Sequence, residues 1–374
     1  MASEHTELLR ESVADFVSRR MSITRVRALR GTGHEYDRDV WREMASLGWL
    51  GIVIPEEYGG MGLGLTDAAI VAEGLARSLA PEPFTAAAVL AAEALTLCDN
   101  EALKRELLPA FVAGEHVCAL AWQESPGATD ADHIATRATP FEGGYRLSGT
   151  KRYVAGAAGA DSYIIAARAD TAVVLACVDS NAASLTVDLE AVADGRHFGT
   201  LQLDGVIVPR ERVAASGDTA AAALSRALDR ATAVASAELY GVMSRALEMS
   251  VEYMKTRVQF GRPIGSFQAL QHRAVDLYIQ QQLASAVLDQ SLRELDTEPS
   301  ATQRAIIASR VKARCSEAGV RIAREAIQMH GAIGFTDDYD VGLYLKRALV
   351  LAAWLGNAVR HRRRYATLAL KREG

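Results

Sequence analysis

A connector between two helical stretches, RVQFGRPIGSFQALQH at residues 257–272, contains more functional groups than a turn between helices needs. Such a turn needs a glycine and sometimes a proline. This connector also carries Arg257, Gln259, Phe260, Arg262, Phe267 and Gln268. Guanidinium groups can donate paired hydrogen bonds to an anion, and phenyl rings offer flat apolar surface. The composition of the connector therefore raises the question of what it binds.

Four other stretches have polar or glycine-rich turns, and each has a simple structural explanation when it is taken alone. The turn WQESPGATD (122–130) could direct backbone N–H groups at a phosphate, but polar turns after strands are common. Tyr153 in SGTKRYVAG is typical of packing within a strand. Gly331 in QMHGAIGFT is typical of a helix C-cap, and PEEYGG (55–60) is typical of a tight loop, unless its glycines let backbone approach a ligand.

Three segments of the chain differ in the spacing of their apolar residues, and they predict an α+β protein. Helical spacing predicts an N-terminal helical domain over 1–115. Short alternating runs with frequent turns predict a middle β-barrel or sandwich domain over 116–215, not a parallel sheet. Long helices return over 216–374 and predict a C-terminal four-helix bundle. The four helices are expected at roughly 218–256, 266–294, 301–330 and 338–369.

Composition excludes several classes of partner. The net charge is −5, so there is no basic field to attract nucleic acid. The four scattered cysteines match neither a metal motif nor a disulfide framework, which favours a reducing compartment. The acidic, amphipathic N-terminus is unlike a signal peptide, and no run of 18 apolar residues occurs. We therefore expect a cytoplasmic protein with no metal site, no nucleic-acid partner and no membrane span.

Taken together, the motifs resemble those of the acyl-CoA dehydrogenase family of flavoproteins over essentially the whole chain. Any one of them is weak evidence, but all occur in the family's order and spacing. They are PEEYGG (55–60), Glu124 to Asp130, GTKRYV (149–154), VIVPRERV (206–213), RVQFGRPIGSFQ (257–268) and QMHGAIGFT (328–336).

This resemblance implies the same three-domain order, usually in dimers of dimers. It also implies FAD as cofactor, an acyl-CoA thioester as substrate and an electron-transfer acceptor as redox partner. In the family the flavin ring lies between the middle domain and the bundle, and the adenine and pyrophosphate reach a neighbouring subunit. The connector would then be the loop that grips the dinucleotide of the neighbour's FAD.

The resemblance assigns cofactor-binding roles to two sets of residues. The set lent to the neighbour's FAD consists of Arg257, Gln259, Phe260, Phe267, Gln328 and Gly331. Arg257 would bind pyrophosphate and the two phenylalanine rings would face the adenine. The set expected at the chain's own flavin consists of Gln123, Thr129 and Tyr153, with Thr129 in place of the usual serine.

The family reaction needs a base that this sequence does not supply at either known position. Members remove a proton α to the thioester, normally with a glutamate, and pass a hydride to the flavin. At the usual position, expected on the last helix, the aligned residue is Leu355, and no Asp or Glu occurs over 341–372. At the alternative position, on the first bundle helix, it is Ala231. Asp229 is two residues away and therefore points about 200° around the helix. The catalytic residue thus stays unknown.

The set at the chain's own flavin also departs from the family pattern. Members commonly have Thr-Glu-Pro where this chain has Gln123-Glu124-Ser125. They also have Trp-Ile-Thr where it has Tyr153-Val154-Ala155, and Ala155 lacks the hydroxyl that bonds the flavin. The half of the site that a subunit gives to its own flavin is thus altered, whereas the half lent to a neighbour is intact.

Three hypotheses follow from this asymmetry. The chain is the non-catalytic partner in a heteromeric acyl-CoA dehydrogenase, an α2β2 assembly like those acting on steroid side-chain thioesters. Alternatively it is a homo-oligomeric flavoenzyme, either with a base at another position or with a flavin reaction that needs no glutamate. In the third, it keeps the fold as a scaffold or acyl-CoA binder without flavin.

Overall fold

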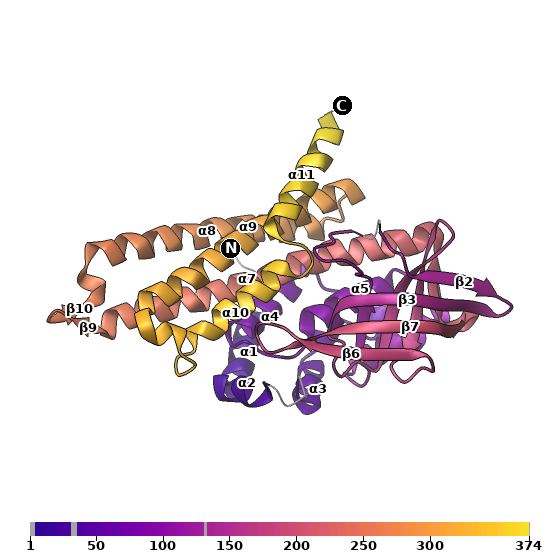
Figure 1. Ribbon diagram of the computed structural model, residues 1–374, viewed down its shortest axis with the longest axis horizontal. Coiled ribbons are helices and arrows are strands. Elements are labelled where there is room, and N and C mark those ends of the chain that lie inside the picture. Colours follow the sequence, from indigo (N-terminus) through magenta and orange to yellow (C-terminus); the bar gives the residue numbers. More distant parts are fainter. Residues whose placement is uncertain (1–3, 31–35, 131–132, 374) are drawn as a thin grey trace. The chain divides into compact units, whose positions relative to one another are not determined.

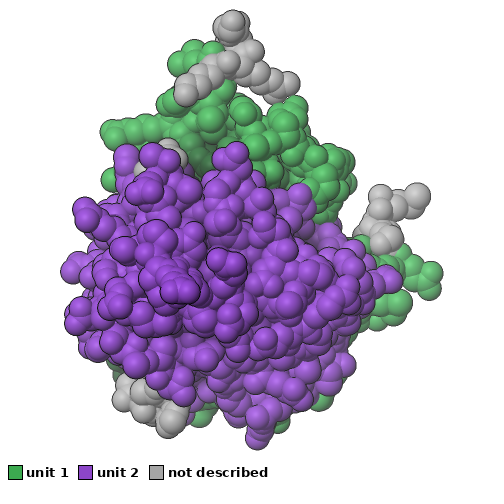
Figure 2. All heavy atoms as spheres, turned by 90° about the vertical axis from the view of Figure 1, so that its right-hand side faces the viewer, with its two compact units in different colours: residues 1–26, 69–80, 232–374 green, residues 27–68, 81–231 purple. Residues whose placement is uncertain are grey.

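The computed structural model describes residues 4–30, 36–130 and 133–373 of the chain. Helices come first, then a β domain, then long helices, in the order that the sequence predicts (Figure 1). Within the described residues, no helix combines the length and the apolar composition that crossing a membrane requires. The chain divides into two compact units, which are coloured separately in Figure 2. Unit 1 is residues 1–26, 69–80 and 232–374, and unit 2 is residues 27–68 and 81–231.

The N-terminal segment is helical, with short helices of other pitch between the α-helices. The α-helices are α1 (Glu4–Arg20), α2 (Ile23–Leu29), α3 (Arg38–Ser46), α4 (Leu65–Arg77), α5 (Ala92–Thr96) and α6 (Glu101–Val112). The short helices are η1 (Trp49–Gly51), η2 (Glu56–Tyr58) and the π-helix η3 (Phe84–Ala91).

The PEEYGG loop has a structural role within unit 2. The hydroxyl of Tyr58 lies 3.1 and 3.0 Å from the two carboxylate oxygens of Glu101, which ties the loop to α6. A Cβ at Gly60 would lie 2.0 Å from the carbonyl oxygen of Ile54. The backbone that Gly60 lets approach is therefore the chain's own, and the tight-loop interpretation is the one supported.

The middle segment forms a mainly antiparallel eight-stranded sheet in the order β6-β7-β3-β2-β4-β5-β8, with β1 beside β4. Only the β1–β4 and β2–β4 pairings are parallel among the described strands. The strands are β1 (Cys118–Ala121), β2 (Arg137–Phe141), β3 (Gly144–Ala155), β4 (Ser162–Ala169), β5 (Ala172–Asp179), β6 (Leu185–Ala191), β7 (His197–Pro209) and, after the short helix η4 (Arg210–Arg212), β8 (Val213–Ser216).

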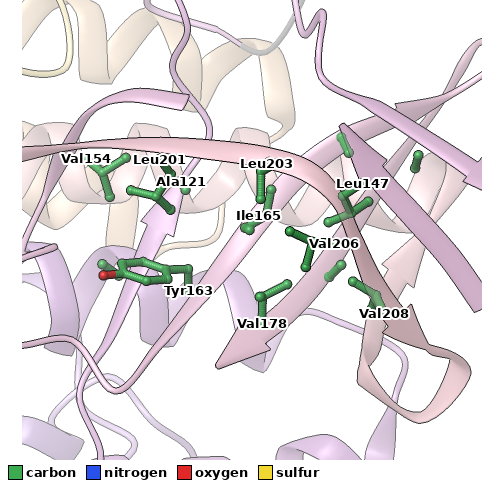
Figure 3. Close-up of a cluster of buried hydrophobic side chains, with 14 of the residues drawn as sticks. Ala121, Leu147, Val154, Tyr163, Ile165, Val178, Leu201, Leu203, Val206 and Val208 are labelled. Atoms are coloured by element: carbon green, nitrogen blue, oxygen red, sulfur yellow. The ribbon is translucent and has the colours of Figure 1, made fainter. Parts of the chain in front are cut away.

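Alternating side chains of these strands form one core. Along β7, Leu201, Leu203, Val206 and Val208 are buried while the residues between them are more exposed. They pack with Leu147 of β3 and with side chains of β4 and β5 (Figure 3). The period of two, shifted by one residue between Leu203 and Val206 where the register with β3 also shifts, keeps one face of the antiparallel sheet buried.

The C-terminal segment contains five α-helices instead of the four expected. They and the short elements between them are α7 (Gly217–Thr256), β9 (Val258–Gln259), β10 (Arg262–Pro263), η5 (Ile264–Ser266), α8 (Gln268–Asp296), α9 (Ala301–His330), η6 (Gly331–Phe335), α10 (Val341–Ala353) and α11 (Ala358–Glu373). The first three long helices match their predicted ranges closely. The fourth, expected unbroken over 338–369, is wrong because residues 354–357 interrupt it.

Small residues let the helices of unit 1 approach closely. A Cβ at Gly241 of α7 would lie 2.3 Å from the carbonyl oxygen of Glu73 in α4, and one at Gly74 would lie 2.2 Å from Val13 of α1. Larger side chains at these positions would separate the helices. The alanine and glycine content of this segment therefore produces close helix packing.

Candidate functional site

The connector that the sequence singles out folds into an antiparallel hairpin, β9–β10, between α7 and α8 (Figure 1). Gln259 pairs with Arg262, and the two residues between them have positive φ, 51° for Phe260 and 78° for Gly261. Positive φ at both central residues of a two-residue loop is the signature of a type I′ turn, which favours Asn-Gly. A phenylalanine in this left-handed region costs roughly 1–2 kcal/mol. Strain of this kind gathers at functional sites, which supports a task for the Phe260 side chain.

The hairpin presents its side chains to solvent. The Phe260 side chain is 90% exposed, and Arg257 and Gln259 are exposed as well. Phe267 is half-buried, because the Arg262 guanidinium lies 4.3 Å from its ring centroid and the Phe260 ring meets it edge to face, with centroids 6.2 Å apart. One face of Phe267 is thus covered by a cation–π contact, so Phe260 is the more accessible of the two rings.

The second stretch expected at the neighbour's FAD is the turn after α9. The Gly331 amide donates to the Gln328 carbonyl, and Gly331 ends the helix with φ 64° and ψ −140°, a backbone region that glycine adopts readily. A Cβ at Gly334 would lie 2.8 Å from the Ile327 carbonyl oxygen, so the turn doubles back tightly on the helix end. Gln328 and the backbone at Gly331 are exposed, and so is Phe335, at 80%.

In the middle domain, a buried ion pair holds the polar turn 122–130. Lys151 is fully buried within β3, and its Nζ lies 2.5 Å from Oε1 of Glu124. Glu124 also accepts from the Ala135 amide (2.7 Å) and from the amide and hydroxyl of Thr136 (3.0 and 2.7 Å). Burial lowers the pKa of Lys151 to about 8. Burial opposes ionisation of Glu124 too, but Lys151 and the Thr136 bonds outweigh it and lower the Glu124 pKa.

The side chains expected at the chain's own flavin make local contacts. The buried Gln123 amide donates to the Ser125 carbonyl at 2.9 Å, and the Thr129 hydroxyl donates to Oδ2 of Asp130 at 3.3 Å. Tyr153 is 36% exposed and has a φ of 56°. It lies in a bulge of β3, where Lys151 pairs with Leu201 but Val154 already pairs with Gly199. Such bulges redirect a side chain.

The usual base position lies in the break between α10 and α11, so its expected location on a helix is wrong. Leu355 has a φ of 57° and is 2% exposed. Gly356 follows with a φ of 92°, and the Asn357 side chain accepts from the Arg360 amide at 3.0 Å, which caps α11.

Two buried basic side chains hold this break. Lys312 of α9 is fully buried and donates to the carbonyl of Leu351 near the end of α10. His361 of α11 is 1% exposed, and its Nε2 donates to the Leu355 carbonyl at 2.7 Å. Burial lowers the pKa of Lys312 to about 7 and that of His361 to about 3. The turn that carries the family base is therefore rigidly built here, around an aliphatic side chain.

The alternative base position is also aliphatic and buried. Ala231 is 0% exposed on α7, and Asp229, two residues earlier on the same helix, is 1% exposed. The adjacent Arg230 donates through Nε to Glu93 of α5 at 2.7 Å, and both side chains are buried. Glu93, an acid near this position, is thus engaged in an ion pair with Arg230 within unit 2.

Comparison with known proteins decides the family. Residues 3–115 match the family model "Acyl-CoA dehydrogenase, N-terminal domain", and residues 220–369 match "Acyl-CoA dehydrogenase, C-terminal domain". Acyl-CoA dehydrogenase IpdE2 of Mycolicibacterium smegmatis is 32% identical over 355 residues, which are 95% of this chain and 95% of that protein. The chain belongs to the acyl-CoA dehydrogenase family.

Solved structures of this family superpose on nearly the whole chain. The Tcur3481-Tcur3483 steroid ACAD has a TM-score of 0.89 and 30% identity, with 99% of both chains covered. The ChsE4-ChsE5 complex from Mycobacterium tuberculosis has a TM-score of 0.89 and 28% identity, with 99% of this chain and 98% of that chain covered. The acyl-CoA dehydrogenase fold expected from the sequence is thereby confirmed. The expected membership of this family of oxidoreductases is confirmed as well. The domain boundaries at 115 and 215 stay predictions.

The predicted site residues fall into both compact units. Unit 1 contains the hairpin residues Arg257, Gln259, Phe260 and Phe267, the turn residues Gln328 and Gly331, and the base position Leu355. Unit 2 contains Gln123, Thr129, Tyr153 and the alternative base position Ala231. The assignment of these residues to FAD stays a prediction.

The sequence analysis missed the buried basic groups that hold the polar turn 122–130 and the break between α10 and α11. Lys151 lies within a motif that the sequence singled out, and a lysine inside an alternating strand is a signal for a buried partner. Lys312 and His361 gave no such signal, because a lysine or histidine on a helix is usually solvated. Their role appears only when α9, α10 and α11 are packed together.

Proposed function

We propose that this chain is the non-catalytic partner in a heteromeric acyl-CoA dehydrogenase. It would lend the Arg257 hairpin and the Gln328–Gly331 turn to the FAD of a related catalytic subunit. That subunit would supply the base and the flavin pocket for α,β-dehydrogenation of an acyl-CoA thioester.

The observation that carries this proposal is the chemistry of the two base positions. Leu355 and Ala231 are both buried and aliphatic, and neither can take up a proton. The turn that holds Leu355 is fixed by Lys312 and His361, so a nearby acid could enter it only if these bonds broke. A chain without a base can still contribute to the reaction by binding what its partner uses.

The hairpin and turn fit the adenine half of a dinucleotide. Arg257 can donate two parallel hydrogen bonds to a pyrophosphate, and the Phe260 ring offers an accessible flat face. Gln328 adds an amide, and the exposed backbone at Gly331 has no Cβ to prevent close approach. The side chains of Arg257, Phe260 and Gln328 are all exposed, which supports a ligand shared with another chain.

The groups expected at the chain's own flavin fit less well. Ala155 offers no hydroxyl, and the Gln123 amide already closes its own turn on the Ser125 carbonyl. Thr129 could still donate to a phosphate if it exchanged its contact with Asp130. The residues expected at the chain's own flavin thus offer fewer groups to the cofactor than the hairpin and turn offer to a neighbour's FAD.

Two relatives favour an assembly of unlike subunits. The ChsE4-ChsE5 structure is described as a complex, and the Tcur3481-Tcur3483 protein is named by two components and described as a steroid ACAD. By analogy, the substrate of the assembly is a thioester from steroid degradation.

When bound, FAD would supply the acceptor for a hydride from the β carbon of the thioester. In this account, Arg257 of the present chain neutralises the pyrophosphate and thereby fixes the position of the cofactor. Phe260 covers the adenine and excludes water from it. The chain moves no proton in the reaction.

The test is to co-express the chain with those dehydrogenases of its own genome that retain the family glutamate. We expect one of these dehydrogenases to co-purify with this chain as an assembly that contains FAD and oxidises acyl-CoA. Arg257→Glu in this chain should then release FAD from the assembly, although the base is on the other chain. If none of these dehydrogenases co-purifies with this chain, the heteromeric proposal is wrong, and the homo-oligomeric flavoenzyme and the scaffold without flavin are the remaining candidates.

A further inference from the structure

A buried histidine joins the two elements that form the lent half of the site. His330 is the last residue of α9, directly before Gly331, and is 3% exposed. Its ring stacks on Tyr253 of α7, with centroids 4.5 Å apart and planes at 30°. On another side it contacts Tyr339, before α10, at 4.7 Å and 45°. Tyr253 and Tyr339 also meet edge to face at 6.0 Å.

The ring cluster is linked to both ligand-facing elements, to the hairpin by backbone hydrogen bonds and to the turn through the chain itself. The Arg257 amide donates to the Tyr253 carbonyl at 2.8 Å, and the Ile264 amide donates to the Arg257 carbonyl at 2.8 Å. Tyr253 therefore lies one helical turn before Arg257, the residue that precedes the hairpin, and is joined to it by this backbone hydrogen bond. His330 adjoins the turn covalently, and a Cβ at Gly334 would lie 3.1 Å from the Cβ of His330.

The His330 ring is held in one orientation. Its Nδ1 lies 2.7 Å from the Ala326 carbonyl, and because a carbonyl only accepts, Nδ1 carries the hydrogen. Nε2 has no hydrogen-bond partner among the described residues. A second proton there would be buried without an acceptor, and this burial lowers the pKa of His330. A neutral, flat ring with one fixed tautomer suits close packing against two aromatic side chains.

We propose that His330, clasped by Tyr253 and Tyr339, is a positioning residue that sets the separation between the Arg257 hairpin and the Gln328–Gly331 turn. The role rests on the proposed function, because the separation matters only if both elements hold one dinucleotide. His330 itself touches no ligand. It acts by keeping Arg257 where its guanidinium can reach the pyrophosphate while the turn approaches it from the other element.

The experiment measures FAD affinity in the assembly that carries FAD, after removal of the cofactor and titration with FAD. His330→Ala removes the ring and should weaken FAD binding roughly tenfold, which corresponds to about 1.4 kcal/mol. His330→Phe keeps a flat ring between the tyrosines and should restore most of the affinity. Tyr253→Phe should be silent, whereas Tyr253→Leu should resemble His330→Ala.

Two further variants separate positioning from general destabilisation. His116 is a matched control, because it is also a histidine stacked on an aromatic ring, Phe111, at 5.7 Å, but lies in unit 2. His116→Ala should leave FAD affinity unchanged. If His330 acts through Arg257, the double variant with Arg257→Ala should lose little more affinity than Arg257→Ala alone.

The outcomes are distinguishable. Full affinity in His330→Ala together with a loss in Arg257→Ala would overturn the positioning role and leave the proposed function standing. Independent, multiplicative losses in the double variant, or equal losses in His330→Phe and His330→Ala, would also overturn it. Full affinity in Arg257→Ala would refute the shared dinucleotide site, and the positioning role with it.

Discussion

At the residue scale, exposed side chains of the candidate site are available to a ligand, whereas buried side chains hold its turns in place. Phe260, at 90% exposure, strains its backbone and packs little, whereas Lys151, Lys312 and His361 are buried and each holds a turn. Substitutions of the first kind should change ligand binding without changing stability. Substitutions of the second kind should change stability first.

Replacing Glu124 by Gln should destabilise the chain by about 3 kcal/mol or more, because it leaves the Lys151 ammonium buried without its counter-charge. Urea unfolding of the purified variant measures the loss. The double variant Glu124→Leu with Lys151→Met should be less destabilised than the single substitutions predict by addition. As control, Asp15→Asn breaks the exposed Arg19–Asp15 pair and should change stability by at most about 0.5 kcal/mol. A Glu124→Gln effect as small as this control would contradict the role assigned to the pair.

Acidification should reduce the free energy of unfolding through His361. Its folded-state pKa is lowered to about 3, so between pH 6.5 and 3 the unfolded chain binds a proton that the folded chain does not. Stability is therefore lost as pH falls through this window, and the loss from this residue is complete near pH 3. His361→Gln should flatten the slope of unfolding free energy against pH over the same window. An unchanged slope in the variant would show that other groups cause the loss.

At the scale of elements, the hairpin β9–β10 and the break between α10 and α11 have different physical origins. The hairpin is local, since two residues with positive φ and two cross-strand pairs define it. The break depends on distant groups, since Lys312 lies 39 residues before the carbonyl of Leu351 that it binds.

Phe260→Asn separates the turn from the ring. Asn-Gly is the preferred pair for a type I′ turn, so the variant should be at least as stable as the native chain. It should nevertheless weaken FAD binding in the assembly, because the exposed ring is lost. Thermal unfolding and FAD titration measure the two effects. Phe141→Ala, at a phenylalanine 42% exposed on β2, is the matched control and should leave FAD binding unchanged. If Phe260→Asn binds FAD normally, the ring is not part of the site.

These origins explain what could be predicted from the sequence. The connector was recognisable because Arg257, Phe260 and Phe267 occur together between two helical runs, although its hairpin form was not predicted. The break at Trp354–Asn357 was missed because Ala353, Trp354 and Leu355 are compatible with a helix, and a single glycine does not end one by itself. The carbonyls freed at the break are satisfied by side chains from α9 and α11, which no local pattern reveals. Lys151 differs, because its place in an alternating strand signals a buried partner, but only the folded β domain shows that this partner is Glu124.

At the scale of the whole molecule, the chain has the acyl-CoA dehydrogenase fold, but both positions where the family places its catalytic base hold buried aliphatic residues. Fold and order of domains followed from motifs distributed along the chain. The pairing of this chain with a catalytic subunit concerns surfaces and ligands outside it, so a single sequence supplies only the asymmetry that suggests it.

Restoring the acid alone should not create an enzyme. Leu355→Glu places a carboxylate at the usual base position, but Ala155 still lacks the hydroxyl and the surroundings of residue 355 are buried. The purified variant without a partner should therefore show no oxidation of acyl-CoA with an artificial electron acceptor. Leu355→Gln serves as the uncharged control for any loss of stability. Turnover by Leu355→Glu above that of Leu355→Gln would mean that the chain's own flavin site is functional.

The most direct test of the central claim is the absorbance spectrum and assembly mass of the chain, purified alone and with its co-expressed partner. The account predicts a colourless preparation for the chain alone. With the partner, it predicts an α2β2 mass, a flavin spectrum and oxidation of acyl-CoA. A chain that purifies alone with stoichiometric FAD and oxidises acyl-CoA would contradict it.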